Sequence, residues 1–173
     1  MENNLLNIAL FQNLVSILLS ILTIYITLKI TNKYIYKKHK ISKDNIAYSI
    51  LLSGIILSVV YLMSGISAPI LNTFRFLKMS LDSFGNIYLE MIKYIGLFLS
   101  IALLTSISII LFTFFLFKST HKGLSIYEEI QNNNIAVSII TAIIFVSFSL
   151  LIKENMILLI ETFIPYPSTP NLY

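Results

Sequence analysis

One six-residue pattern, Asn-Ile-Ala-x-Ser-Ile, occurs twice in the chain and carries polar side chains that could form specific hydrogen bonds. It begins at Asn45 and again at Asn134, an offset of 89 residues, each time at the start of a long apolar run. The side-chain oxygen of Asn or Asp accepts hydrogen bonds from the free N–H groups in the first turn of a helix. The pattern therefore predicts helix capping at two equivalent places, either by Asp44 and Asn133 or by Asn45 and Asn134.

Small side chains follow both predicted caps and indicate that the first turns of each helix are narrow. The residues assigned to the repeated capping motif are Asp44, Asn45, Ala47, Ser49, Asn133, Asn134, Ala136 and Ser138. Further small residues at helical spacing predict a helix-packing seam, since they let helix backbones approach closely in a membrane. The seam residues are Ser53, Gly54, Ser58 and Ala142. The alternative interpretation is that small and hydroxyl side chains line a pore or a substrate path.

Catalytic motifs are missing from the sequence, which argues against an enzyme. It has no phosphate-binding loop, no nucleophile elbow, no zinc-protease motif and no dinucleotide fingerprint. The chain also has no Cys, which excludes disulfides, Cys-ligated metals and thiol nucleophiles. His39 and His121 lie among lysines in predicted loops, and one His beside two acidic residues does not make a metal site. We expect no catalytic residue, no cofactor site and no metal ligand.

Composition and hydropathy predict a polytopic membrane protein. Hydrophobic residues make up 57% of the chain and charged residues only 12%, with a mean hydropathy of +0.85. Crossing a bilayer as a helix needs roughly 20 apolar residues. The apolar runs of suitable length have their cores at residues 14–28, 46–63, 94–117 and 135–152. The sequence therefore predicts an all-α fold with four transmembrane helices.

Basic residues are distributed unequally between the two sides of this predicted bundle. The two short connections carry Lys29, Lys33, Lys37, Lys38, Lys40, Lys43, Lys118 and Lys122. The opposite side carries Arg75, Lys78, Lys93 and Lys153. The positive-inside rule then places the short connections in the cytoplasm and both termini outside. Orientation in a membrane accounts for the net charge of +4, so no nucleic-acid partner is expected.

The lysines between the first two predicted spans also suggest a lipid partner. Basic residues near a membrane surface attract anionic headgroups by about 1 kcal/mol each. Contact with anionic lipid is therefore expected at Lys33, Lys37, Lys38, Lys40 and Lys43. The plainer interpretation of the same cluster is a topology signal alone.

The connection over residues 64–93 is the longest, and its sequence allows two interpretations. Ile70, Phe74, Leu77 and Leu81 recur at helical spacing, which is typical of a short amphipathic helix lying in the outer interface. The alternative is an ordinary outer loop with scattered apolar residues.

The end of the fourth span is predicted from its charges. Because a charge is costly at mid-bilayer, Lys153 and Glu154 should lie at the interface and end the span there. Residues 156–173 form a C-terminal extension. Its first part, up to Ile164, either extends the fourth span or lies on the membrane surface, and its Pro-rich tail is expected to be extended.

The repeated pattern divides the predicted membrane domain, residues 1–155, into two similar halves. Each half is a helical hairpin with its basic loop on the same side, over about residues 5–65 and about residues 94–155. Two hairpins that point the same way form a parallel repeat, related by a pseudo-two-fold axis along the membrane normal.

The two motif segments resemble a known family. Residues 44–57 read D-N-I-A-Y-S-I-L-L-S-G-I-I-L, and residues 133–144 read N-N-I-A-V-S-I-I-T-A-I-I. They are similar to the openings of the second and fourth helices in the bacterial YjfL-type inner-membrane family, the domain of unknown function 350. The resemblance covers about residues 5–155, and the chain departs from it in its longer outer connection and its C-terminal extension. It implies a location in the bacterial inner membrane and a link to envelope maintenance, but no established activity.

Two functions are consistent with these observations. The first is a non-enzymatic, homo-oligomeric structural or envelope-maintenance subunit of the membrane. The alternative is a small channel or transporter built from the two repeated hairpins. No ionisable residue lies within the core of a predicted span, which argues against a proton-coupled carrier.

Overall fold

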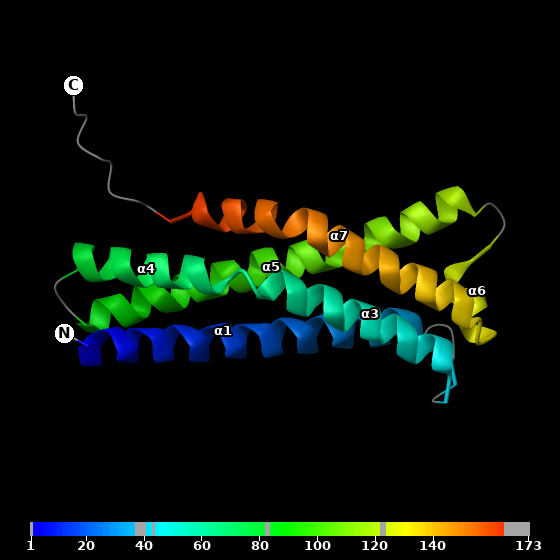
Figure 1. Ribbon diagram of the computed structural model, residues 1–173, viewed down its shortest axis with the longest axis horizontal. Coiled ribbons are helices and arrows are strands. Elements are labelled where there is room, and N and C mark those ends of the chain that lie inside the picture. The colour runs from blue at the N-terminus through cyan, green and yellow to red at the C-terminus, as the bar shows by residue number, and fades with distance from the viewer. Residues whose placement is uncertain (1, 37–40, 43, 82–83, 122–123, 165–173) are drawn as a thin grey trace, which may run out of the picture.

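The computed structural model describes residues 2–36, 41–42, 44–81, 84–121 and 124–164. Every regular element within these ranges is a helix, which confirms the predicted all-α fold. Figure 1 shows an elongated bundle whose long helices run along its long axis, which is horizontal in this view. The segments long and apolar enough to cross a membrane are Leu10–Tyr34, Ile46–Ser80, Gly85–Thr120 and Ile135–Glu161. The chain is therefore a multi-pass membrane protein with four candidate spans, as predicted.

Helices α1 and α3 pack against each other and correspond to the first predicted hairpin. Helix α1 (Glu2–Thr31) is continuous and ends in a π-helical turn, η1 (Asn32–Tyr36). Helix α3 (Ile46–Met63) returns alongside it and rises about 27 Å, close to the roughly 30 Å of a hydrocarbon core. It is the most buried of the candidate spans, because α1, α5 and α7 all pack against it.

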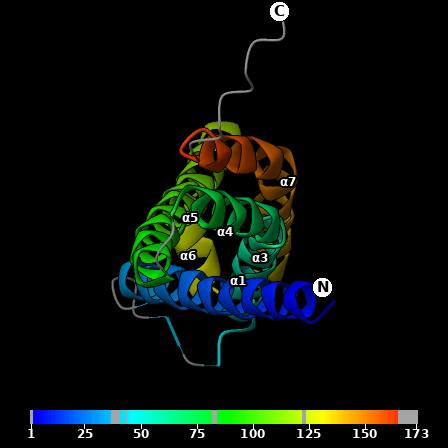
Figure 2. The same cartoon turned by 90° about the vertical axis from the view of Figure 1, so that its left-hand side faces the viewer.

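The predicted outer connection is almost entirely helical. After a turn at residues 64–66, helix α4 (Ser67–Ser80) buries Ile70 and Leu77, two of the residues expected on its apolar face. Figure 1 shows that α4 continues along the bundle axis from α3, and Figure 2 shows it inside the ring of longer helices. The Phe11 and Phe74 rings, 5.5 Å apart, join it to α1. Helix α4 therefore packs as part of the bundle instead of lying across its end.

Helices α5 and α7, which correspond to the second predicted hairpin, pack against each other and, taken together, are longer than α1 and α3. Helix α5 (Phe84–Thr120) rises about 55 Å, and α7 (Ile135–Glu161) rises about 40 Å. The short helix α6 (Ile126–Gln131) lies between them. Helix α7 runs without a break past Lys153 and Glu154, so its residues 156–161 extend the fourth span as a helix. The Pro-rich tail, residues 165–173, lies outside the described residues.

The lengths of the helices indicate which end of the bundle extends beyond a membrane. We call the end where α1 and α5 finish and α3 and α7 begin the basic end, because Lys33 and Lys118 lie there. About 20 residues from it, the span of a bilayer, α3 reaches its turn near Gly65 and α7 reaches Lys153. There the Lys153 ammonium lies 4.7 Å from the centre of the Tyr61 ring. The predicted interface at Lys153 fits this geometry, although the helix continues beyond it.

Candidate functional site

The repeated Asn residues lie at the basic end and cap their own helices. The Asn45 side-chain oxygen accepts a hydrogen bond from the Tyr48 N–H at 2.7 Å. The Asn134 side-chain oxygen accepts from the Val137 N–H at 3.2 Å. Both caps have nearly the same extended backbone, with φ and ψ of −76° and 108° at Asn45 and −73° and 97° at Asn134. The repeated sequence thus produces the same local structure twice.

The same Asn-rich segments also bind each other across the two hairpins. The Asn133 side-chain oxygen accepts from the Ala47 N–H at 2.9 Å, so a residue before α7 caps α3. In return, the Asn45 amide donates to the Ile130 carbonyl at the end of α6 at 2.6 Å. Asn133 has a φ of 59°, a left-handed conformation that Asn tolerates well. These four partners, with Asn134, are called the asparagine cluster below.

Two further contacts surround the asparagine cluster. The Asn134 amide donates to a Glu129 carboxylate oxygen at 2.6 Å, and the buried Tyr48 hydroxyl donates to the Asn32 side-chain oxygen. Asp44 is exposed and its backbone N–H lies 3.4 Å from the Ser42 hydroxyl. Of the predicted alternatives, the structure therefore uses Asn45 and Asn134 for their own helices, and Asn133 for the neighbouring one.

The small residues after the caps lie in different environments in the two copies. Ala47 is buried and Ser49 is exposed in α3, whereas Ala136 is exposed and Ser138 is buried in α7. One residue corresponds to about 100° around a helix. The buried face of α7 is therefore rotated relative to that of α3, and the predicted slim face is not the same face in both helices.

The predicted packing seam lies where α3 and α7 approach each other most closely. A Cβ atom placed on Gly54 would lie only 2.5 Å from the Ala142 Cβ and 2.7 Å from its Cα. The buried Ser58 hydroxyl donates to the Phe145 carbonyl on α7 at 3.0 Å. Ser53 is exposed beside this contact. Gly54, Ala142 and Ser58 thus join the two helices, as expected for small residues in a membrane.

A shallow groove of about 350 Å³ runs over the outer side of this contact. Its lining combines the small residues Ser53, Gly54, Ala142 and Ser147 with the larger Ile50, Leu57, Ile139, Ile143 and Val146. We call it the α3–α7 groove. The small side chains in its lining lie on the outer surface of the bundle.

Most buried hydroxyl groups are bonded within their own helix. Thr23, for example, donates to the Leu19 carbonyl, and Thr141 donates to the Val137 carbonyl, both at 2.8 Å. Within the described parts of the chain, three buried hydroxyls have no hydrogen-bond partner: those of Thr27, Thr31 and Thr113. A buried hydroxyl without a partner costs about 1–3 kcal/mol, so these positions call for an explanation.

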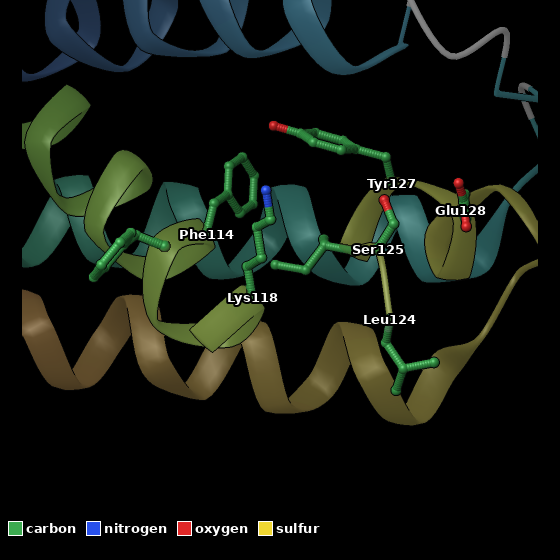
Figure 3. Close-up of a pocket in the computed structure, with 8 residues that line it drawn as sticks. Phe114, Lys118, Leu124, Ser125, Tyr127 and Glu128 are labelled. Carbon is green, nitrogen blue, oxygen red and sulfur yellow. The ribbon is translucent and has the colours of Figure 1, made fainter. Parts of the chain in front are cut away.

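Two hollows at the basic end were not anticipated from the sequence. The larger, about 790 Å³, lies between the end of α5 and α6, and Figure 3 shows Phe114, Lys118, Ser125 and Tyr127 around it. The smaller, about 550 Å³, lies between α1 with η1 and α5. We call it the α1–α5 groove, and its lining includes Ile30, Thr31, Lys33, Ile110, Leu111, Phe114 and Tyr127.

An aromatic pair separates these two hollows. The rings of Phe114 and Tyr127 meet edge to face at 5.4 Å, and both residues line both hollows. Among the described residues, Lys118 lines the larger hollow and Lys33 lines the smaller. Figure 3 shows the Lys118 amino group directed toward Phe114 and Tyr127, whereas Glu128 lies on the far side of Ser125. Burial raises the pKa of the Tyr127 phenol, so its hydroxyl stays protonated at neutral pH.

The sequence analysis predicted a role for only one residue of this region, Lys33. Lys33 was assigned to lipid contact, and its neighbours Lys37, Lys38, Lys40 and Lys43 lie outside the described residues. Nothing in the local pattern brings Thr31, Phe114 and Tyr127 together, because they come from three different elements. Among the residues with described positions, no three His, Asp or Glu side chains gather closely enough to hold a metal ion.

Comparison with known proteins agrees with this architecture. No curated protein and no solved structure matches the chain. The family model described as Domain of Unknown Function (DUF350) matches residues 1–156, which include the asparagine cluster, the first three candidate spans and most of α7. The chain therefore belongs to the DUF350 family.

Proposed function

We propose that the protein is a non-enzymatic, homo-oligomeric structural subunit of the bacterial inner membrane that helps to maintain the envelope. The observation that carries the proposal is the α3–α7 groove. It opens outward from two candidate spans, and its lining includes the small residues Ser53, Gly54, Ala142 and Ser147. In a membrane, such residues allow a second helix to approach closely and gain dispersion energy.

The lining of this groove also supports the internal repeat and a symmetric contact. Four pairs of lining residues are related by the same offset as the asparagine caps. They are Ile50 with Ile139, Ser53 with Ala142, Gly54 with Ile143, and Leu57 with Val146. Each pair takes one residue from α3 and one from α7. A pseudo-symmetric groove of this kind suits a self-complementary contact with a second copy about a two-fold axis.

The channel alternative has one observation in its favour, the unpartnered hydroxyls of Thr27, Thr31 and Thr113. Against it, Phe98, Phe117 and Phe145 are fully buried and fill the interior. A structural subunit is therefore the better proposal for a single chain. Purified protein in liposomes should show no selective ion flux above empty vesicles, and a robust selective flux would favour the channel instead.

Single Cys variants can test the oligomer directly, because the native chain has no Cys. Ser53→Cys places a thiol in the α3–α7 groove, and Ser108→Cys places one at an exposed position on α5 as a matched control. After mild oxidation in native membranes, we expect a disulfide-linked dimer for Ser53→Cys and little for Ser108→Cys. Equal crosslinking of both variants, or none in either, would count against a contact through the groove.

The same approach tests the proposed orientation, with the asparagine cluster and the lysines in the cytoplasm and both termini outside. Ser42 is exposed near the basic end, and Thr162 is exposed at the end of α7. In intact cells, an impermeant thiol reagent should label Thr162→Cys and leave Ser42→Cys unlabelled. The reverse pattern would invert the topology. In the proposed orientation, the lysines at and after η1 contact anionic headgroups of the inner leaflet.

A further inference from the structure

The α1–α5 groove combines an apolar wall with a polar end. Ile30, Ile110 and Leu111 supply aliphatic surface, and Phe114 closes one side. Leu111 is 63% exposed, so the groove is open along the outside of the bundle. Its volume of about 550 Å³ is within the range of about 300–1,000 Å³ that is usual for ligand pockets.

Two polar groups at one end of the groove lack a partner. Thr31 is 3% exposed, and its hydroxyl has no hydrogen-bond partner among the described residues. Lys33 is exposed and makes no ion pair within the same part of the chain. The π-helical turn η1 begins directly after Thr31, and π-helical turns are frequent at functional sites. A hydroxyl donor and an ammonium donor are thus close in sequence on the same groove lining.

The depth of these two groups matches the chemistry of a phospholipid. The first candidate span ends at Tyr34, so Lys33 lies at the level of headgroups and Thr31 lies just inside it. The charge near the groove is positive, since Lys29 and Lys33 are on α1 and η1. The nearby carboxylates are on α6, where Glu129 accepts from Asn134 and Glu128 lines the other hollow.

We propose that the α1–α5 groove is a specific site for an anionic phospholipid. One acyl chain lies along Ile30, Ile110 and Leu111, and the phosphate binds Lys33. This occupant neutralises the Lys33 ammonium and covers the apolar wall that Leu111 exposes. The inference deepens the headgroup contact proposed for Lys33, but it does not depend on the oligomer, which crosslinking tests separately.

The absence of Trp allows a direct test, because an introduced Trp is the sole indole in the protein. Leu111→Trp reports on the groove. Leu104→Trp is the control, since Leu104 is also on α5, is 67% exposed and lines none of the hollows described. Each purified variant is reconstituted in phosphatidylcholine vesicles containing brominated phosphatidylglycerol or brominated phosphatidylcholine. The ratio of quenching by the two lipids is compared for each variant, so that a difference in depth cancels.

We expect Leu111→Trp to prefer phosphatidylglycerol about fivefold, the factor that one lysine near an anionic headgroup supplies. Leu104→Trp should show a ratio near one. Adding Lys33→Gln to Leu111→Trp should return its ratio to near one, whereas adding Lys78→Gln, an exposed lysine on α4, should leave it unchanged. Thermal unfolding of each variant verifies that the fold is intact.

Three results would overturn the proposal. A ratio near one at Leu111→Trp would show that the groove does not select an anionic lipid. A preference that survives Lys33→Gln would place the selective contact elsewhere. Loss of the preference on addition of inorganic phosphate, at constant ionic strength, would show that a free anion occupies the lysine and that the acyl chain contributes nothing.

Discussion

The substitution Gly54→Ala tests the closest helix contact in the protein. The added Cβ would lie 2.5 Å from the Ala142 Cβ and 2.7 Å from its Cα, and the Cα belongs to the backbone of α7 and cannot rotate away. The two helices must therefore separate by several tenths of an ångström. Overpacking of this kind typically costs about 1–3 kcal/mol, and the better helix propensity of Ala offsets about 0.5–1 kcal/mol of it.

Gly96→Ala provides a matched control in the same protein. Gly96 is exposed on α5, and a Cβ placed on it would meet no atom within 4 Å. Only the propensity effect applies there, so Gly96→Ala should stabilise the protein by about 0.5–1 kcal/mol. For a chain of this size, 1 kcal/mol corresponds to about 2–4 °C in Tm. We expect Gly54→Ala to lower the Tm by up to about 10 °C and Gly96→Ala to raise it by about 1–4 °C.

The assay is thermal unfolding of each purified variant in one mild detergent, followed by circular dichroism. The double variant Gly54→Ala with Ala142→Gly removes the 2.5 Å contact but keeps the 2.7 Å contact with the Ala142 Cα, so it should recover part of the loss. If Gly54→Ala and Gly96→Ala shift the Tm in the same direction by similar amounts, α3 and α7 do not approach as closely as described, and the seam assignment is wrong.

Two further predictions concern polar groups inside the bundle. Asn45→Ala removes the cap on the Tyr48 N–H and one of the donors to the Ile130 carbonyl, which keeps its bond from the Asn133 N–H. It should therefore destabilise by about 1–2 kcal/mol, whereas Asn132→Ala at an exposed position should change stability by less than about 0.5 kcal/mol. A similar Tm for both variants would contradict the role of the asparagine cluster. Thr113→Val should stabilise by about 1 kcal/mol, because its hydroxyl has no partner among the described residues, while Thr23→Val, which loses a bond to the Leu19 carbonyl, should not. The same thermal assay measures both variants. If Thr113→Val and Thr23→Val both raise the Tm, the hydrogen bond of Thr23 does not contribute to stability.

The features predictable from the sequence were those that depend on local interactions. Capping needs only a polar side chain within three residues of the N–H it binds, so Asn45 and Asn134 could be assigned as alternatives directly. The spans followed from composition, because no other environment suits such long apolar runs. The helix over residues 67–80 was suggested by its apolar spacing.

The features that escaped prediction depend on tertiary packing. Amphipathic spacing shows that α4 has an apolar face but does not say that Phe11 of α1 covers it, so the orientation of α4 along the bundle was not foreseen. A charge pair marks an interface but does not stop a helix, which is why α7 continues past Glu154. The α1–α5 groove is formed by residues from four elements, α1, η1, α5 and α6, which no local pattern relates.

In the folded protein, the two occurrences of the Asn-Ile-Ala pattern depend on each other for hydrogen-bond partners. If the two hairpins were independent copies, each Asn-Ile-Ala block would complete its own helix entrance. Instead, the second N–H group of α3 donates to Asn133, which precedes α7, and the Asn45 amide donates to the carbonyl of Ile130, in the last turn of α6. The first hairpin alone would therefore leave the Ala47 N–H and the Asn45 amide without these partners, and near a membrane such a loss is costly. The burial of Ala47 and Ala136 also differs, since a larger share of the candidate span that contains α3 is buried than of the span formed by α7. Each occurrence of the Asn-Ile-Ala pattern thus supplies a cap, and the contacts between the two occurrences give their residues different partners.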